Sequence, residues 1–81
     1  MKSFQLTIAK VSENVYEGEA VAAILPGSEG EFTVLAHHEP FITTLANGSA
    51  RVKETESDEY IDFAIQGGIA EISSNRATII L

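Results

Sequence analysis

The sequence predicts an all-β fold: a flattened β-sandwich or barrel of about eight to ten short, mostly antiparallel strands. Three observations support this prediction. No segment carries the i, i+3, i+4, i+7 apolar spacing of an amphipathic helix over about ten residues. Short apolar stretches instead alternate with polar residues, and turn-forming residues recur at about the 8–12-residue spacing of sandwiches and barrels. A chain of 81 residues has room for one core, so residues 1–81 are expected to form a single domain.

The first half of the chain is expected to contain four strands. They cover residues 4–8, 14–17, 20–25 and 32–35. Phe4, Leu6 and Ile8 alternate with polar neighbours, which is the period-2 pattern of a strand with one buried face. Residues 20–25 are almost wholly apolar and end at Pro26-Gly27, a strong turn signal. A strand that is apolar on both sides has to be covered on both sides, either by a second sheet or by a partner protein.

The second half of the chain is expected to contain five further strands. They cover residues 41–45, 50–54, 60–65, 69–72 and 77–81. Asn47-Gly48 is a turn signal, and the acidic segment 54–59 has the composition of a solvated hairpin tip. Gly67-Gly68 interrupts the strand pattern, and adjacent glycines in a strand indicate a bulge or a close backbone approach. Ser74-Asn75 predicts the turn before the last strand.

Composition excludes several classes of partner. Two Asp and ten Glu against three Lys and two Arg give a formal charge of −7, which repels phosphate backbones, so nucleic-acid binding is not expected. Cysteine is absent, which leaves neither a disulfide framework nor a thiolate metal cluster. The longest apolar stretch, residues 20–25, is far shorter than the ~20 residues of a membrane-spanning helix, and no secretory signal is recognisable. Direct membrane insertion is therefore not expected.

His37, His38 and Glu39 are metal ligands by residue type. Adjacent side chains in an extended segment point to opposite sides, so the three do not converge easily on one ion. The simpler interpretation is that one imidazole fixes the loop by a hydrogen bond to the backbone while the other faces solvent or a partner. A small metal-dependent enzyme built on these residues is kept as an alternative, but no metal site is predicted.

The remaining polar residues do not form a catalytic set. Ser28 lacks the G-x-S-x-G spacing and the strand-to-helix turn of a nucleophile elbow. Glu29 and Glu31 lie in one turn, and a glycosidase pair would need a cleft that so small a chain can scarcely build. Gly67-Gly68 is not followed by the Lys-Ser/Thr of a phosphate-binding loop. No catalytic residue and no cofactor are therefore predicted, and the residues alone indicate a small β-sandwich interaction module.

A string that begins at Pro26 resembles the signature P-G-x-x-G-E-F-G-V-L-P-x-H-A-P-L of the epsilon subunit of bacterial and chloroplast ATP synthases, whose mitochondrial counterpart is the delta subunit. The matching residues are Pro26, Gly27, Gly30, Glu31, Phe32, Val34, Leu35, His38 and Pro40, followed by Leu45 and Gly48. Residues 66–72 are similar to the family's S-G-G-F-x-E-V, and residues 4–8 and 16–19 fit its first two strands. The departures from the pattern are Thr33 for Gly, Ala36 for Pro, Glu39 for Ala, Phe41 for Leu and Ile69 for Phe.

The resemblance implies a non-catalytic rotor subunit in the central stalk of a proton- or sodium-translocating ATP synthase. Its partners would be the gamma subunit and the membrane ring of proteolipid (c-type) subunits. The resemblance places Ser28, Glu29, Gly30 and Glu31 in the loop that faces the ring, and His38, Pro40, Phe41 and Leu45 toward gamma. It gives structural roles, in turns or bulges, to Pro26, Gly27, Gly48, Gly67 and Gly68.

The family's C-terminal helical hairpin has no counterpart in these residues, so inhibition and ATP sensing are not expected of this chain. The expected location is the cytoplasmic face of a bacterial energy-transducing membrane, or the stromal face of the thylakoid, with contact to the membrane through the complex. The alternative is a free-standing β-sandwich that binds a small ligand or a peptide. Its mark would be a deep apolar pocket in place of a flat apolar face.

Overall fold

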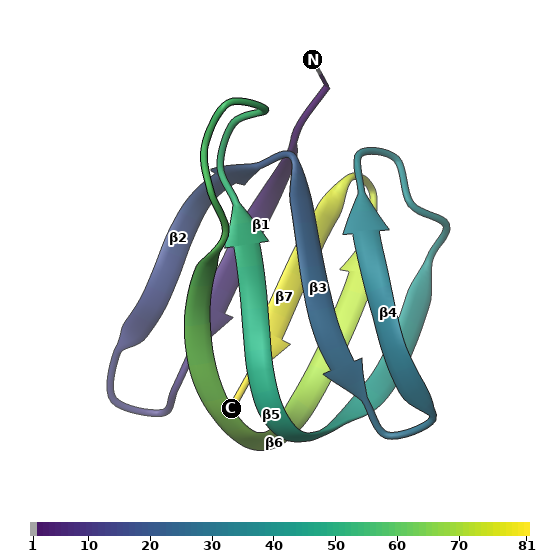
Figure 1. Cartoon of the computed structure of the whole chain (residues 1–81). Helices are drawn as coiled ribbons and strands as arrows, with labels where there is room; N and C mark the ends of the chain where they lie inside the picture. Colours follow the sequence, from purple (N-terminus) through teal and green to yellow (C-terminus); the bar gives the residue numbers. More distant parts are fainter. Residues whose placement is uncertain (1) are drawn as a thin grey trace.

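The structure is a computed structural model that describes residues 2–81 (Figure 1). Its strands are β1 (Phe4–Ala9), β2 (Asn14–Ala20), β3 (Ala22–Gly27), β4 (Gly30–Leu35), β5 (Phe41–Lys53), β6 (Ile61–Ser73) and β7 (Arg76–Ile80). The described residues form these seven strands and no helix, which confirms the all-β prediction. There are fewer strands than expected, because β5 and β6 are each continuous over 13 residues. The sequence pattern had divided each of them into two strands.

All seven strands belong to one hydrogen-bonded sheet, in the order β2-β1-β7-β6-β5-β3-β4. Neighbours are antiparallel, except β1 and β7, which are parallel. The sheet folds over on itself at β5 and β6, which curve through the lower part of Figure 1. The first layer consists of β2, β1, β7, the C-terminal half of β6 and the N-terminal half of β5. The second layer consists of β4, β3 and the other halves of β5 and β6.

The core lies between these two layers. Its buried members are Phe4, Leu6, Ile8, Ala20, Ala23, Leu25, Val34, Leu45, Ala50, Val52, Ile65, Ala70, Ile72, Ala77 and Ile79. The alternation predicted for Phe4, Leu6 and Ile8 is confirmed, because all three are buried and their neighbours are not. In β3, Ala23 and Leu25 are fully buried and Ile24 is half-buried. The apolar segment 20–25 is thus covered mostly within the fold and does not provide the surface for a partner.

The inward side of β6 changes at Gly67-Gly68. Before the glycines the buried position is Ile65, and after them the buried positions are Ala70 and Ile72, so the buried positions change from odd to even numbers. Gly67 and Gly68 have φ angles of 79° and 133°, which side chains with a Cβ rarely adopt. The pairing with β5 continues without a shift in register through these positions. The glycines therefore let β6 turn from one layer to the other, and the expected interruption of the ladder at this point is wrong.

The turn expected at Asn47-Gly48 is also wrong, because both residues lie within β5. On the side of β6 the register is regular, but on the side of β3 it shifts between Ile24 and Gly27. Gly48 lies opposite this irregularity, and a Cβ there would be 3.2 Å from Cβ of Pro26. Gly48 therefore permits β5 to bend closely past β3 without ending the strand.

Asn75 joins three segments that are distant in sequence. Ser74 and Asn75 form the two-residue turn between β6 and β7 with φ angles of 54° and 58°, as in a type I′ turn, which favours Asn. The side-chain Nδ2 of Asn75 donates to the carbonyl of Ser3 at 2.9 Å, and its Oδ1 accepts from the backbone N–H of His37 at 2.7 Å. The predicted turn is confirmed, and its side chain holds the loop 36–40 against the start of β1.

We expect the Asn75→Ala substitution to lower the free energy of unfolding by about 2–3 kcal/mol, because two hydrogen bonds are lost and Ala tolerates the positive φ poorly. Asn75→Gly is the matched variant, since it accepts the positive φ and lacks only the side-chain bonds. Its expected cost is about 1–2 kcal/mol. Urea denaturation of the three proteins measures both costs. Wild-type stability in Asn75→Gly would show that the side-chain bonds contribute nothing.

Candidate functional site

Three exposed isoleucines lie on the outer side of the first layer, on the same face as Thr44 and Glu71. Ile42, Ile69 and Ile80 are exposed by 67%, 48% and 49%. Ile69 of β6 lies directly opposite Ile80 of β7 on one side and Thr44 of β5 on the other, and Ile42 is two positions from Thr44 on the same strand face. The three side chains therefore project from adjacent strands on one side of the sheet. We call Ile42, Ile69 and Ile80 the isoleucine face; clustered exposed apolar side chains of this kind mark interaction sites.

The isoleucine face is not recognisable from the sequence pattern alone. Its members come from three strands, and they become neighbours only through the registers of β5 with β6 and of β6 with β7. The available signal was that Ile42 and Ile69 lie beside apolar neighbours within expected strands, so both sides of those strands are apolar. The same pattern is more pronounced in residues 20–25, which the fold itself covers.

The turn between β3 and β4 presents two carboxylates at one end of the sandwich. Ser28 and Glu29 form its two-residue tip, Gly27 pairs with Gly30, and Glu31 follows in β4. The four residues Ser28, Glu29, Gly30 and Glu31 are all exposed, so the structure places this predicted loop on the surface. A Cβ on Gly27 would lie 2.6 Å from the carbonyl oxygen of Gly30, so only glycine fits there. The hairpin tip is therefore compact, acidic and accessible.

Of the four residues expected to face gamma, three reach the surface and one is buried. Phe41 is 42% exposed, Pro40 is exposed and His38 is half-buried. The ring of His38 lies 6.1 Å from that of Phe41, which in turn contacts the edge of Phe32 at 5.3 Å. Leu45 is only 5% exposed and belongs to the core, so its expected contact with a partner is corrected. Its place in the alternation of β5 directs it inward, where it pairs with Gly68 at the bend.

The expectation for the loop histidines agrees with the structure. Nδ1 of His38 lies 2.7 Å from the carbonyl oxygen of Glu39, so this imidazole fixes the loop by a backbone hydrogen bond, while His37 is exposed. Within residues 2–81, no group of three His, Asp or Glu side chains is arranged to hold a metal ion. The described part of the chain also contains no helix long and apolar enough to cross a membrane.

Tyr16 of β2 has a raised pKa. Burial raises the pKa of Tyr16 to about 12, and the hydrogen bond and negative charge of Glu54 act in the same direction. Its Oη lies 3.0 Å both from Oε2 of Glu54 and from the carbonyl oxygen of Glu19. Its ring meets Phe63 edge-on at 5.9 Å. The tyrosine therefore fastens the edge strand β2 to the acidic connection between β5 and β6 and stays protonated at neutral pH.

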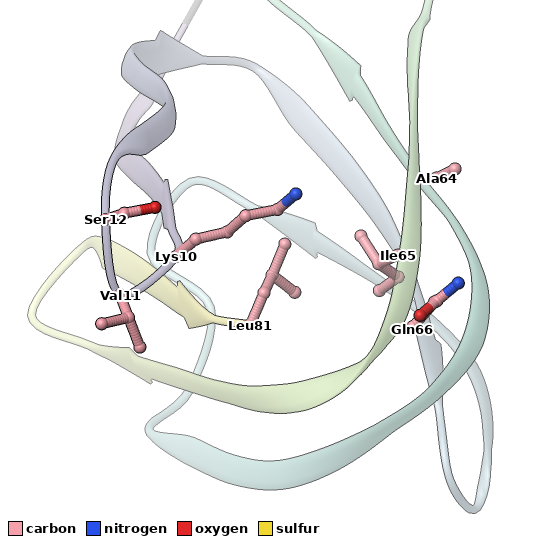
Figure 2. Close-up of a pocket in the computed structure, with 7 residues that line it drawn as sticks. All are labelled: Lys10, Val11, Ser12, Ala64, Ile65, Gln66 and Leu81. Carbon is pink, nitrogen blue, oxygen red and sulfur yellow. The ribbon is translucent and has the colours of Figure 1, made fainter.

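A hollow of about 560 Å³ lies between the β1–β2 connection, the middle of β6 and the end of the chain (Figure 2). It is lined by Lys10, Val11, Ser12, Ala64, Ile65, Gln66 and Leu81. Its volume is that of a small-molecule site, but Val11 is fully exposed and only Ile65 is buried, so the lining does not enclose a ligand. The deep apolar pocket that would favour a free-standing ligand-binding module is not seen here.

Comparison with known proteins gives consistent results. Residues 3–81 match the family model described as the β-sandwich domain of the ATP synthase delta/epsilon chain. The ATP synthase epsilon chain of Caulobacter vibrioides is 35% identical over 80 residues, which cover 99% of this chain and 91% of that relative. The epsilon chain of Lactiplantibacillus plantarum is 38% identical over 80 residues, covering 98% of this chain and 56% of that relative.

A solved structure agrees in fold. A chain of the Euglena gracilis mitochondrial ATP synthase, in a structure of its OSCP/F1/c-ring, superimposes with a TM-score of 0.88 and 28% identity. The superposition covers 96% of this chain and 49% of that one. This chain therefore spans nearly all of one bacterial relative and about half of the other proteins named here.

Proposed function

Because the chain belongs to the ATP synthase delta/epsilon family, whose β-sandwich domain it matches over residues 3–81, we propose that it is a non-catalytic subunit of the central stalk. In this role residues 1–81 act as one β-sandwich domain that links the gamma subunit to the ring of proteolipid subunits. Ion flow through the ring, of protons or sodium ions, is thereby coupled to ATP synthesis. The subunit associates with the membrane through the complex, on the side where ATP is made.

The observation that carries the proposal is the isoleucine face. Ile42, Ile69 and Ile80 expose about half or more of their surface to water on one side of the first layer. Covering such a side chain removes apolar surface from water and gains on the order of 1 kcal/mol for each half-exposed isoleucine. A permanent partner suits this surface better than a transient one, since the apolar area is costly to expose repeatedly. We assign the face to gamma, together with the adjoining surface residues His38, Pro40 and Phe41.

The acidic hairpin tip has a different chemistry. Glu29 and Glu31 are exposed carboxylates at the end of a hairpin, and they suit polar or basic loops of a partner rather than an apolar surface. We assign Ser28, Glu29, Gly30 and Glu31 to the proteolipid ring. A contact of this kind is expected to weaken with ionic strength, because exposed charges are screened by salt.

Calorimetric titration of the chain into the gamma subunit of the same source tests the stalk assignment directly. We expect saturable one-to-one binding with co-elution on a sizing column. The binding heat should become more exothermic with temperature, since burial of apolar surface lowers the heat capacity. No binding between two folded proteins would contradict the assignment to the stalk and leave family membership unchanged.

We expect Glu31→Lys to reduce ATP synthesis driven by an ion gradient about two- to five-fold in reconstituted vesicles. The reason is that an exposed charge at the edge of an interface contributes up to about 1 kcal/mol to binding. The free energy of unfolding and the affinity for gamma should stay unchanged, since Glu31 is exposed and lies outside the isoleucine face. Glu56→Lys makes the same change of charge in the exposed acidic loop and is the matched control. Equal rates of synthesis in the two variants would contradict the assignment of the hairpin tip to the ring.

A further inference from the structure

The acidic hairpin tip is bonded to the strand that carries part of the isoleucine face. The backbone N–H of Ser28 donates to the carbonyl oxygen of Thr44 at 3.0 Å. The hydroxyl of Thr44 donates to Oγ of Ser28 at 2.8 Å. Thr44 lies in β5 between Ile42 and the bend, and it pairs with Ile69. One residue therefore contacts the tip of the hairpin through both its backbone and its side chain, beside the isoleucine face.

Aromatic packing supports the same junction. Phe32, which follows the hairpin tip in β4, meets Phe41 edge-on with ring centroids 5.3 Å apart and an angle of 73° between the ring planes. Phe41 begins β5 and also neighbours the ring of His38. The aromatic contacts and the hydrogen bonds thus connect the same two segments, the β3–β4 hairpin and the N-terminal half of β5.

We propose that Thr44 is a positioning residue whose hydroxyl, through Ser28, fixes the acidic hairpin tip relative to the isoleucine face. This inference rests on the proposed function, in which the tip faces the proteolipid ring and the face binds gamma. The turn of an edge hairpin is less restrained than the middle of the sheet, because the hairpin is paired on one side only, so one further side-chain bond at the tip matters. Thr44 and Ser28 join the two contact surfaces into one stiff unit, so a force received at the tip displaces β5 rather than the turn.

The first part of the test uses the isolated chain and does not depend on any partner. We expect Thr44→Val to speed amide hydrogen exchange at residues 28–30 about five-fold, which is the effect of losing one ordinary hydrogen bond. Exchange at the core residues Val52 and Ile72 should not change. Thr44→Ser retains the hydroxyl and should restore wild-type exchange at the tip. Thr33→Val removes the hydroxyl of an exposed threonine in β4 and is the matched control.

The second part uses the assembled enzyme and a double-mutant cycle. Thr44→Val and Ser28→Ala should each lower ion-driven ATP synthesis about two-fold, as expected for a local loosening. The double variant should be no worse than either single one, because each removes the same bond. Thr44→Ser should synthesise ATP at the wild-type rate.

The outcomes separate this inference from the proposed function. Unchanged exchange at the tip in Thr44→Val, or additive losses of synthesis in the cycle, would overturn the positioning role. Faster exchange together with full synthesis would also overturn it, since the tip would then not need to be fixed. Failure of the wild-type chain to bind gamma would instead contradict the proposed function, while the exchange experiment would still report on the bond itself.

Discussion

Gly68→Ala is expected to destabilise the fold by about 3 kcal/mol, the largest effect we expect from removal or addition of a single methyl group. Gly68 has a φ of 133°, where a residue with a Cβ is strained. A Cβ at this position would also lie 2.5 Å from the carbonyl oxygen of Ile80, which belongs to the backbone of β7. Because β7 is held between β6 and β1, it cannot move away without breaking its own pairing. The cost therefore includes both backbone strain and a displaced strand.

Urea denaturation of three glycine variants tests this expectation. Gly67→Ala is strained by the φ of 79°, but its Cβ would meet no atom closer than 3.6 Å. We therefore expect it to lose about half as much free energy of unfolding as Gly68→Ala. Gly18→Ala lies in the edge strand β2, where its Cβ would make ordinary contacts at 3.7 Å with Tyr16, and it should be neutral or slightly stabilising. Equal stability of Gly68→Ala and Gly18→Ala would contradict the close approach of β6 and β7.

The layered all-β fold was predictable because some of its strands and turns obey simple local rules. In β1 the buried residues alternate with half-buried ones as the sequence indicates. The turns at Pro26 to Gly30 and at Ser74-Asn75 consist of residues that such turns require, and the chain turns at both places. The long strands β5 and β6 were not predictable in the same way. Glycines at positions 48, 67 and 68 were expected to interrupt strands, whereas they allow continuous strands to bend between layers.

The two candidate surfaces also differ in how far the sequence predicts them. The acidic hairpin tip is contiguous in sequence, so its turn residues and carboxylates were identified together. The isoleucine face combines Ile42, Ile69 and Ile80 from three strands, and only the register of the sheet brings them together. Leu45 was expected at the surface because it matches the family signature, but the alternation of β5 directs its side chain into the core. Position within the sheet, which sequence spacing does not give, decides whether such a residue reaches a partner.

Ile69→Glu is expected to weaken binding to the gamma subunit about 100-fold, corresponding to about 2.7 kcal/mol. Ile69 lies between the strands that carry Ile42 and Ile80, so it occupies the middle of the isoleucine face. A carboxylate there would have to lose its water where the partner covers an apolar side chain. Glu71, two residues further along the same side of β6, adds to the negative charge. Calorimetric titration into gamma measures the change in affinity.

Leu35→Glu provides the matched control, because Leu35 is 55% exposed but lies in the edge strand β4 of the second layer, outside the isoleucine face. It should bind gamma with wild-type affinity, and both variants should unfold within about 1 kcal/mol of the wild type, since neither side chain is in the core. Ile80→Glu should reproduce the loss seen with Ile69→Glu, because the two isoleucines are direct cross-strand neighbours. If Leu35→Glu abolished binding and the two isoleucine variants did not, gamma would contact the second layer. The isoleucine face would then have to serve a different partner, and the orientation that we propose for the sandwich in the stalk would be reversed.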